Sequence, residues 1–292
     1  MIPAIIQKRA TAQLSKTLGE EITITGSEEV EGGCIHNAHR VDTNLGTYFI
    51  KWNSKDNLVN YEAESRGLEM LAATGTLRTP RPICTGKAAG FAFLIVEYIT
   101  PGERDDNYWT EFGASLARLH RNGSETFGLD ENNFIGDLPQ SNNRHESWLE
   151  FYVKERIEPQ LQFARDRSLA DRALLSQFNK FIGKIDRYMP EGKPALLHGD
   201  LWAGNCMTGK DGLAVVFDPA VYYGHREAEI AFTKLFGDFD KSFYTAYNEE
   251  WALESGWEDR LNLFNLYPLL VHLNLFGSGY RPQLENAIKK YV

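Results

Sequence analysis

The hydrophobic residues of the first 18 positions recur at the spacing of a helix. These apolar side chains fall on or near one helical face: Ile2, Ile5, Ile6, Leu14 and Leu18. Gly19 follows directly, and glycine is a common residue just after the last turn of a helix. The pattern therefore predicts an amphipathic helix at the start of the chain.

From residue 21 to residue 99 the pattern becomes that of β-strands. Runs rich in β-branched and aromatic residues predict strands at 22–25, 35–42, 47–52 and 91–99. A helical pattern covers residues 57–73, whereas residues 80–86 show no regular period. We therefore expect a β-rich first third that contains one helix after its third strand.

Beyond this region the pattern is mainly helical. The turn-forming segment Thr100-Pro101-Gly102 marks the expected boundary between residues 1–99 and residues 100–292. Helical periodicity follows in five ranges, which are 106–121, 144–166, 169–188, 227–236 and most of 258–292. Only residues 195–217 look stranded in this part. The sequence thus predicts an α+β fold with two lobes, a β-rich N-lobe and a mainly helical C-lobe.

Composition and charge narrow the range of functions. The chain has 292 residues, of which 42% are hydrophobic and 24% charged, as is ordinary for a soluble globular protein. Its net charge of -9 argues against nucleic acid as the main partner, because phosphate backbones are bound by clustered Lys and Arg. No run approaches the roughly 20 apolar residues of a membrane span. The first residues lack a signal-peptide pattern, so we expect a cytoplasmic protein.

Cysteine and histidine offer little support for a metal site. The three cysteines, Cys34, Cys84 and Cys206, form no CxxC pair, which suits a reducing compartment and predicts no zinc site. His36 and His39 have metal-like spacing, but they lie in a glycine-rich stretch where a solvated turn is the better interpretation.

The strongest chemical signal is the segment Leu197-His198-Gly199-Asp200-Leu201-Trp202-Ala203-Gly204-Asn205 and the strand-like run that ends at Asp218. Asp200, Asn205 and Asp218 have the spacing of the catalytic base and the two magnesium ligands of protein-kinase-like folds. The run before Asp218 predicts a hairpin that begins near Asn205, so that these polar groups converge. The alternative is a pair of capped turns around a hairpin.

A phosphoryl-transfer site also needs groups that bind the nucleotide phosphates. Gly32 and Gly33, between the first two strands, let backbone N–H groups approach phosphates, although a Gly-Gly pair is often only a hairpin turn. Lys51 interrupts an apolar strand and is either exposed or functionally placed. Kinases fix such a lysine with a helical glutamate, and we choose Glu64 over Glu62 because Glu64 shares its face with inward-pointing leucines.

The end of the last strand could receive the adenine ring. Glu97, Tyr98 and Ile99 precede the Pro-Gly break, and the backbone of a linker strand can pair with a purine without special side chains. The alternative is that this stretch only links the lobes, and both interpretations can hold together.

These motifs resemble those of the fructosamine kinase, or ketosamine-3-kinase, family, a branch of the aminoglycoside-phosphotransferase and choline-kinase group. The Trp after Asp-Leu in residues 197–205 is close to that branch's signature. The run Phe217-Asp218-Pro219-Ala220-Val221-Tyr222-Tyr223-Gly224-His225-Arg226-Glu227-Ala228-Glu229 is more distinctive, since most relatives outside the branch have Trp or Phe after this Asp. The likeness runs nearly end to end.

The resemblance implies a reaction and its cofactors, ATP and Mg²⁺. Asp200 would accept the proton of a sugar hydroxyl, and Asn205 and Asp218 would hold the metal. Lys51, held by Glu64, would contact the phosphates. The enzyme would phosphorylate the C3 hydroxyl of a ketoamine, whose product can eliminate phosphate and release the amine, which is the family's deglycation role.

The alternatives are a kinase for another small hydroxyl substrate, such as an aminoglycoside, choline or a sugar, and a catalytically silent binding fold. Intact Lys51, Asp200, Asn205 and Asp218 speak against the silent fold. A protein kinase is disfavoured because neither Asp-Phe-Gly nor Ala-Pro-Glu occurs.

Further candidates surround the two motifs. Trp202, Tyr222, His225 and Arg226 are candidate substrate contacts, although packing explains Trp202 and Tyr222, and a helix start explains Arg226, equally well. Cys34 lies in the expected phosphate loop, where a thiolate could be favoured. The resemblance suggests a monomer that could form an inhibitory disulfide-linked dimer through Cys34, and the alternative is a small buried side chain.

Overall fold

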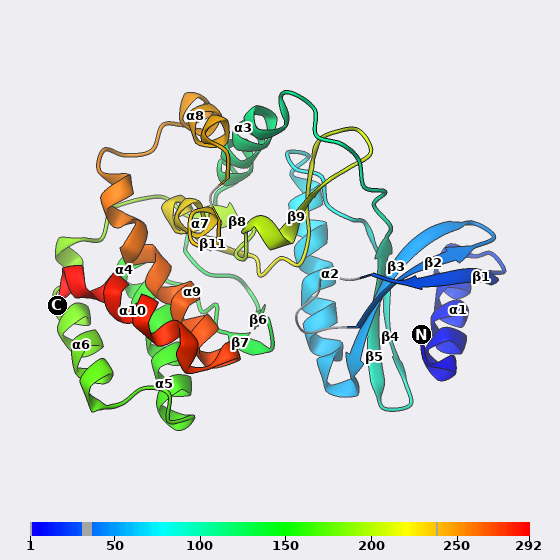
Figure 1. Cartoon of the computed structure of the whole chain (residues 1–292), viewed down its shortest axis with the longest axis horizontal. Coiled ribbons are helices and arrows are strands. Elements are labelled where there is room, and N and C mark those ends of the chain that lie inside the picture. Colours follow the sequence, from blue (N-terminus) through cyan, green and yellow to red (C-terminus); the bar gives the residue numbers. More distant parts are fainter. Residues whose placement is uncertain (1, 31–36, 238) are drawn as a thin grey trace. The chain divides into compact units, whose positions relative to one another are not determined.

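The computed structural model describes residues 2–30, 37–237 and 239–292 (Figure 1). The chain forms two compact units. The first contains Met1–Tyr108 and Gly204–Pro219, and the second contains Trp109–Ala203 and Ala220–Val292. This division differs from the boundary expected at residue 99, because a segment from the middle of the chain belongs with the first unit.

The first unit is built on a five-stranded antiparallel sheet with the order β1-β2-β3-β5-β4. Its strands are β1 (Ile24–Glu29), β2 (Asn37–Thr43), β3 (Gly46–Ser54), β4 (Pro82–Ala88) and β5 (Phe91–Glu97). β4 corrects the expectation of irregular chain at 80–86. The segment Pro-Ile-Cys-Thr-Gly-Lys-Ala has weak strand propensity, and pairing with the strongly apolar β5 makes it an edge strand all the same.

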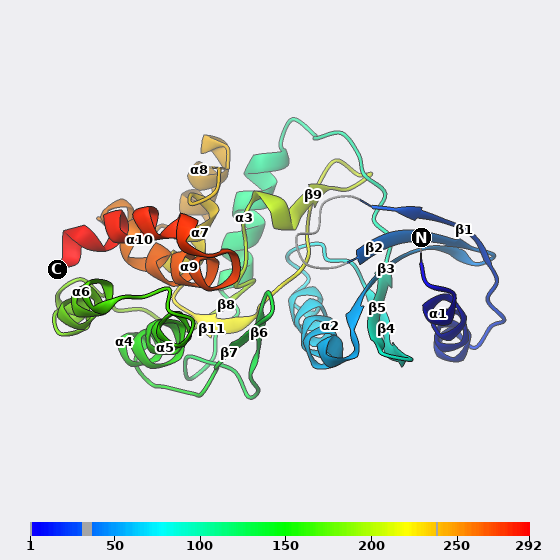
Figure 2. The same cartoon turned by 60° about the horizontal axis from the view of Figure 1, so that its bottom comes forward.

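Two helices cover opposite faces of this sheet, α1 (Ala4–Leu18) and α2 (Leu58–Ala73) (Figure 2). Alternation along β3 decides which side chain meets which helix. Ile50 packs in the core that contains α1, whereas Phe49 packs against the core that contains α2. Lys51 has the same parity as Phe49, so it lies on the α2 face of the sheet.

The expected hairpin after Asn205 is present. β9 (Cys206–Thr208) and β10 (Ala214–Val216) pair in antiparallel fashion. The Val216 N–H donates to the Arg78 carbonyl at 3.0 Å, and the Gly102 N–H donates to the Thr208 carbonyl at 3.0 Å. These long-range backbone bonds explain why Gly204–Pro219 belongs to the first unit, which the local sequence pattern does not reveal.

The second unit is mainly helical. Its helices, with α3 beginning at the last residue of the first unit, are α3 (Tyr108–His120), α4 (Trp148–Phe151), α5 (Glu158–Asp166), α6 (Arg172–Ile182), α7 (Arg226–Thr233), α8 (Lys241–Glu250), α9 (Leu261–Phe276) and α10 (Arg281–Ile288). Two strand pairs accompany them, β6 (Asn133–Ile135) with β7 (Leu138–Gln140), and β8 (Ala195–Leu197) with β11 (Tyr222–Gly224). Helix α8 and strands β6, β7 and β11 were not expected from the sequence.

The helix expected over 144–166 begins at Trp148 and contains a π-helical turn, Tyr152–Ile157, between α4 and α5. Such turns are uncommon and often occur at functional sites. The hydroxyl of Tyr152 donates to the Leu263 carbonyl at 2.6 Å and lies 3.3 Å from that of Phe264. Pro268, inside α9, has no N–H to donate to the Phe264 carbonyl, and the Tyr152 hydroxyl lies beside that carbonyl.

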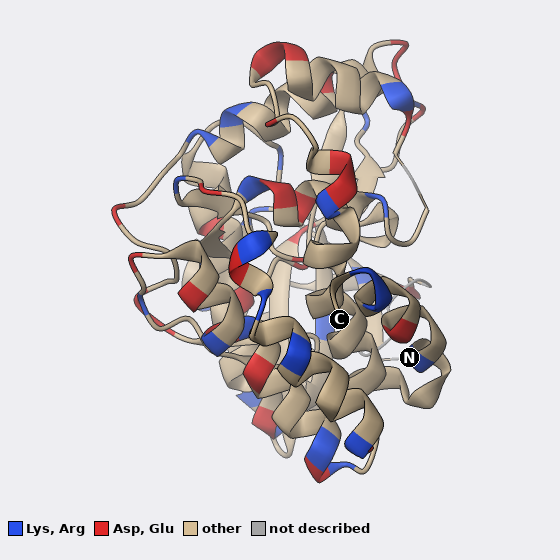
Figure 3. Cartoon of the chain, turned by 90° about the vertical axis from the view of Figure 1, so that its left-hand side faces the viewer, with Lys and Arg blue, Asp and Glu red and all other residues tan. Residues whose placement is uncertain are grey.

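Acidic and basic residues are interspersed along the ribbon seen in Figure 3. Across the described residues, no helix combines the length and apolar character that crossing a membrane requires. Within the described residues, Cys84 and Cys206 form no disulfide. Burial raises the pKa of each to about 11, which disfavours the thiolate. Cys34 lies outside the described residues, so its redox role stays a prediction.

Candidate active site

Lys51 is the centre of a charged cluster in the first unit. It is only 5% exposed. Its Nζ lies 2.6 Å from Oε2 of Glu64 and 2.8 Å from Oδ1 of Asp218. The residue that pairs with Lys51 is therefore Glu64, as chosen from the helical face over Glu62. β3, α2 and the end of the β9–β10 hairpin each contribute one member.

The two carboxylates keep Lys51 charged. Burial opposes the ammonium form, but Asp218 and Glu64 outweigh burial and raise the pKa of Lys51 above its ordinary value. Burial also raises the pKa of Glu64 to about 7, with the Lys51 ammonium opposing this shift. The side chain of Asp218 is 47% exposed, so one arm of the cluster is open to solvent. A cationic group beside an accessible carboxylate suits a site that binds phosphates and their metal.

Asn205 and Asp218 are neighbours at the base of the hairpin. The N–H of Phe217, the residue before Asp218, donates to the Asn205 carbonyl at 3.1 Å. Asp218 itself has φ 56°, a left-handed conformation that Asp tolerates better than most residues. An amide and a carboxylate oxygen are ligands that Mg²⁺ accepts. The described residues contain no group of three or more His, Cys, Asp or Glu that could hold a metal.

The residues at the end of β5 and directly after it, Glu97, Tyr98 and Ile99, make some contacts within the protein. The Glu97 N–H donates to the Arg81 carbonyl at 2.8 Å, and its side chain pairs with Arg78. The guanidinium of Arg40 lies 5.4 Å from the ring centroid of Tyr98. No backbone bond of Tyr98 or Ile99 is recorded among the described residues, so the adenine site stays a prediction. Gly32 and Gly33 lie outside the described residues.

Asp200 belongs to the second unit, in the loop after β8. Gly199 has φ 83°, and a Cβ there would lie 2.0 Å from the Ala220 carbonyl oxygen, so only glycine fits. The carboxylate of Glu229 accepts the N–H groups of His198, at 3.0 Å, and of Gly199, at 2.7 Å. Glu229 therefore fixes the backbone directly before Asp200.

Glu229 is held in turn by His120. Nε2 of His120 donates to Oε2 of Glu229 at 2.9 Å, and its Nδ1 lies 2.7 Å from the Tyr247 hydroxyl. Burial would raise the pKa of Glu229, but the bonds from His120 and from the Gly199 backbone outweigh it and lower that pKa. Sequence reasoning gave neither residue a role. Glu229 stands in the distinctive run that begins at Phe217, but its partner His120 lies 109 positions away, so the pairing has no local sequence signal.

A small cavity of about 20 Å³ opens beside Asp200. Its polar lining includes Asp200, Tyr222, Glu229, Tyr267 and His272, and its lining contains no Lys or Arg. Such a cavity suits a neutral or cationic group better than an anionic one. Tyr222, one of the expected substrate contacts, is therefore in the cavity wall next to the expected base.

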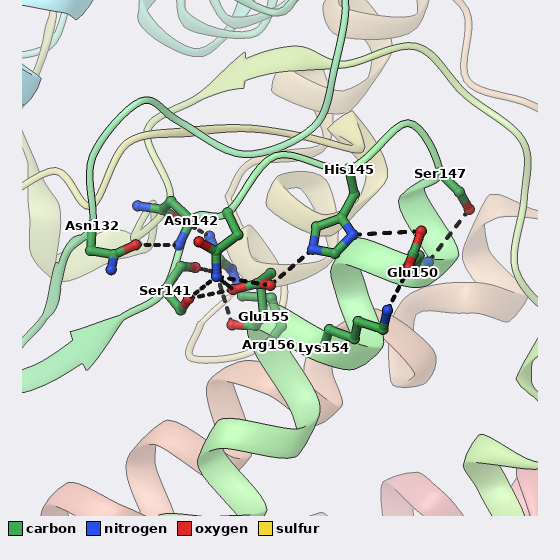
Figure 4. A network of polar contacts seen from close by, with 10 residues as sticks. Asn132, Ser141, Asn142, His145, Ser147, Glu150, Lys154, Glu155 and Arg156 are labelled. Atoms are coloured by element: carbon green, nitrogen blue, oxygen red, sulfur yellow. Dashed lines mark hydrogen bonds and ion pairs between the residues drawn. The ribbon is translucent and has the colours of Figure 1, made fainter.

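Arg156 supports Tyr222 from behind. Its guanidinium is fully buried and lies 4.0 Å from the Tyr222 ring centroid. It donates to the Asn142 side chain at 2.7 Å, and the neighbouring Glu155 accepts from His145 at 2.9 Å (Figure 4). The π-helical turn that contains Glu155 and Arg156 thus fixes a polar network beneath the cavity wall.

The other expected substrate contacts lie elsewhere. His225 caps α7 by accepting the Glu227 N–H at 3.2 Å, and its ring stacks on Phe264. Arg226 donates to the Trp251 carbonyl at 2.8 Å. Neither residue is in the described lining of the Asp200 cavity, and their role as substrate contacts stays a prediction. Trp202 is partly exposed and makes an edge contact with Phe236.

Comparisons with known proteins identify the family of this chain. The fructosamine kinase family model matches residues 6–292. A Synechocystis protein assigned as a ketoamine kinase is 38% identical over 95% of this chain and 94% of its own. The chloroplastic protein-ribulosamine 3-kinase of Arabidopsis thaliana is 38% identical over 94% of this chain and 85% of its own.

Solved structures show the same relationship. A Haemophilus somnus protein assigned to the fructosamine-3-kinases superposes with a TM-score of 0.88 at 28% identity, covering 97% of this chain and 96% of its own. The aminoglycoside phosphotransferase APH(4)-Ia superposes at 0.61 with 14% identity over 98% of both chains, which shows a shared fold alone. The predicted kinase-like α+β fold is thereby confirmed, and the chain belongs to the fructosamine kinase family.

Proposed function

We propose that this protein transfers the γ-phosphate of ATP to the C3 hydroxyl of a ketoamine. Membership of the fructosamine kinase family supports the reaction. The observation that carries the proposal is the fixed loop of Asp200, which presents a carboxylate at a cavity whose described lining contains no Lys or Arg. That chemistry suits a sugar hydroxyl on a molecule bearing a protonated amine.

Asp200 acts as the base for the acceptor hydroxyl. As the C3 oxygen forms its bond to the γ-phosphorus, the bond from that phosphorus to the β–γ bridging oxygen breaks and ADP leaves. The hydroxyl proton passes to the Asp200 carboxylate. Because Glu229 holds the N–H groups of His198 and Gly199, the carboxylate needs little rearrangement before the reaction.

Lys51 binds the ATP phosphates and neutralises part of their charge. Its ammonium is kept protonated by Glu64 and Asp218, so it carries a full positive charge at neutral pH. Asn205 and Asp218 would hold Mg²⁺, which, when bound, neutralises further negative charge on the phosphates. Backbone groups of Glu97, Tyr98 and Ile99 would receive the adenine ring.

Phosphorylation at C3 gives the reaction its consequence. Phosphate is a better leaving group than hydroxide, and C3 lies next to the C2 carbonyl of the open-chain ketoamine. Loss of the C1 proton, which the C2 carbonyl acidifies, lets the C3 phosphate leave by elimination. Water then hydrolyses the resulting imine at C1, which releases the amine. The proposed role of the enzyme is deglycation of amines.

The test is an ATP- and Mg²⁺-dependent assay of ribulose-lysine, fructose-lysine, an aminoglycoside and choline. Turnover of a ketoamine that drops at least about 100-fold in Asp200→Asn would support the proposal. Asp186→Asn, which removes an exposed carboxylate of the same unit, is the matched control and should keep wild-type turnover. Turnover of choline or the aminoglycoside alone would contradict the assignment of a ketoamine as the substrate. Equal turnover of the ketoamine by wild type and Asp200→Asn would contradict the assignment of Asp200 as the base.

A further inference from the structure

A group of aromatic rings in the second unit continues outward from the cavity of Asp200. We call it the aromatic cluster, and it consists of Trp202, Phe232, Phe236, His272, Phe276 and Tyr280. His272 is its centre: its ring centroid lies 4.4 Å from that of Phe236, 5.0 Å from Tyr280 and 5.4 Å from Phe276. Two members, Phe232 and His272, also line the cavity itself.

The cluster is not a closed core. Phe276 is 48% exposed, and Trp202, Phe236 and Tyr280 are partly exposed. Large apolar side chains that stay exposed as a contiguous group often mark a ligand or partner site. Because this group adjoins the cavity of the proposed catalytic base, the ligand that covers it is best sought in the substrate.

His272 presents a hydrogen-bond acceptor in this setting. Its Nδ1 lies 2.8 Å from the Pro268 carbonyl oxygen, which can only accept, so Nδ1 carries the proton. Burial lowers the pKa of His272, which favours the neutral ring. In that state Nε2 has a free lone pair. The ring is therefore suited to accept a proton from a ligand N–H or O–H group.

We propose that the aromatic cluster binds the amine-bearing end of the substrate, that is, the protonated secondary amine and the first carbons of its substituent. This inference rests on the proposed function. In a ketoamine the nitrogen is attached to C1, two carbons from the C3 hydroxyl that Asp200 would deprotonate. A substrate seated with C3 at Asp200 thus brings its nitrogen to the adjoining wall of the same cavity.

The chemistry of the cluster fits this occupant. Aromatic faces attract a cation, and aromatic edges and faces pack against alkyl carbons. Nε2 of His272 accepts from the ammonium N–H. The described cavity lining adds the carboxylate of Asp200 and contains no Lys or Arg. The guanidinium of Arg156 lies behind the Tyr222 ring, where it donates to Asn142. The cluster would therefore select ketoamines over sugars that lack the amine.

The test uses two substrates that share one sugar: a ketoamine with an N-butyl group, and the ether analogue with a neutral 1-O-butyl group. The variants are Phe276→Ala and His272→Leu, with Tyr188→Leu as the control. Tyr188 is a partly exposed aromatic residue of the same unit that packs on Tyr291 and does not line the cavity. His272→Gln, which keeps an acceptor, is the conservative partner of His272→Leu.

We expect the KM for the N-butyl ketoamine to rise roughly 2- to 30-fold in Phe276→Ala, the range of cation–π contacts, while kcat and the KM for ATP stay unchanged. His272→Leu should raise the same KM and His272→Gln should restore part of the loss. The preference for the ketoamine over the ether should decrease in Phe276→Ala and in His272→Leu. It should be unchanged in Tyr188→Leu.

An unchanged KM and an unchanged preference in Phe276→Ala and His272→Leu, with wild-type turnover of the ketoamine, would overturn the inference and leave the proposed function standing. A wild-type enzyme that turns over no ketoamine would instead overturn the proposed function. Circular dichroism and thermal unfolding of each variant identify misfolded proteins, and Phe276→Ala, which truncates an exposed ring, keeps the test decisive if His272→Leu fails to fold.

Discussion

The two units each contain a buried carboxylate, and the two carboxylates are held in different ways. Glu64 in the first unit faces the ammonium of Lys51, which also bonds the half-exposed Asp218. Glu229 in the second unit faces a histidine and two backbone N–H groups, with its side chain 1% exposed. The first arrangement pairs charges at a solvent-accessible edge, and the second pairs one charge with fixed dipoles.

This difference matches two different tasks. A lysine shared between two carboxylates can exchange partners when phosphates and a metal bind, since Asp218 is accessible. A carboxylate that accepts backbone N–H groups cannot exchange them without unfolding the loop, because buried N–H groups are costly to leave unpaired. The Lys51 cluster is thus suited to ligand binding, and the Glu229 network to holding Asp200 in place.

The largest effect is expected from Glu229→Gln. One of the two N–H groups, or His120, would then face the amide NH₂ instead of an acceptor. We expect a loss of about 2–4 kcal/mol in the free energy of unfolding and at least a roughly tenfold fall in kcat, because Asp200 loses its fixed position. Chemical denaturation and initial-rate kinetics measure the two quantities.

Glu227→Gln on the same helix is the matched control. Glu227 is also buried, but it pairs with the Arg260 side chain at 2.7 Å and does not contact the loop of Asp200. The Glu227→Gln variant should be less stable than wild type but should keep a kcat near the wild-type value. An equal fall in kcat for both variants would mean that Glu229 acts only through general stability.

A moderate effect is expected from Glu64→Gln. Lys51 would lose one partner and keep Asp218, so its ammonium would be drawn away from the phosphates. We expect the KM for ATP to rise roughly tenfold, or about 1.4 kcal/mol, with little change in the KM for the ketoamine. Glu62→Gln, two residues away on the same helix, is the control, and an equal rise in that variant would contradict the role of Glu64.

The smallest effect is the pH dependence of stability, which should have opposite signs at the two sites. The pKa of Glu229 is lowered in the folded state. Its contribution is therefore present above the unfolded pKa of about 4.5 and is lost as the pH falls below it. Glu64 has a folded pKa of about 7, so the wild type should gain stability relative to Glu64→Gln as the pH falls from about 7 to 4.5.

Denaturant unfolding of the wild type, Glu229→Gln and Glu64→Gln between about pH 3.5 and 8 measures these slopes. Each variant gives a difference from wild type in the free energy of unfolding at every pH. If these two differences changed with pH in the same direction, the proposed contrast between Glu229 and Glu64 would be wrong. The stability difference between wild type and Glu64→Gln could instead shrink as the pH falls, as expected for Glu229. That result would show that the Lys51 ammonium lowers the pKa of Glu64 more than burial raises it.

Local patterns in the sequence predicted much of the fold. The period of the first 18 residues located α1, and the apolar run at 91–99 located β5. The strand β4 was missed because its residues have weak strand propensity and depend on pairing with β5. The short strands β6, β7 and β11 have three residues each, too few for a periodic signal.

Some residues of the candidate site could also be predicted from local sequence patterns, and others could not. The positions of Lys51, Glu64 and Asp218 follow from strand parity, helical face and motif spacing, and these three residues are in contact. His120 and His272 could not be identified, because their significance comes from partners brought together by the tertiary fold. His225 and Arg226 stand beside the motif in sequence, yet α7 directs them to structural contacts.

The assignment of Gly204–Pro219 to the first unit has a consequence for synthesis of the chain on the ribosome. After residue 108 emerges, the first unit still lacks its second segment, Gly204–Pro219. At about 5–20 residues per second the intervening chain and this segment take roughly 6–22 s to be made. During that interval Lys51 can pair with Glu64 but not with Asp218, so the charged cluster of the first unit is completed only after about three quarters of the chain has been synthesised.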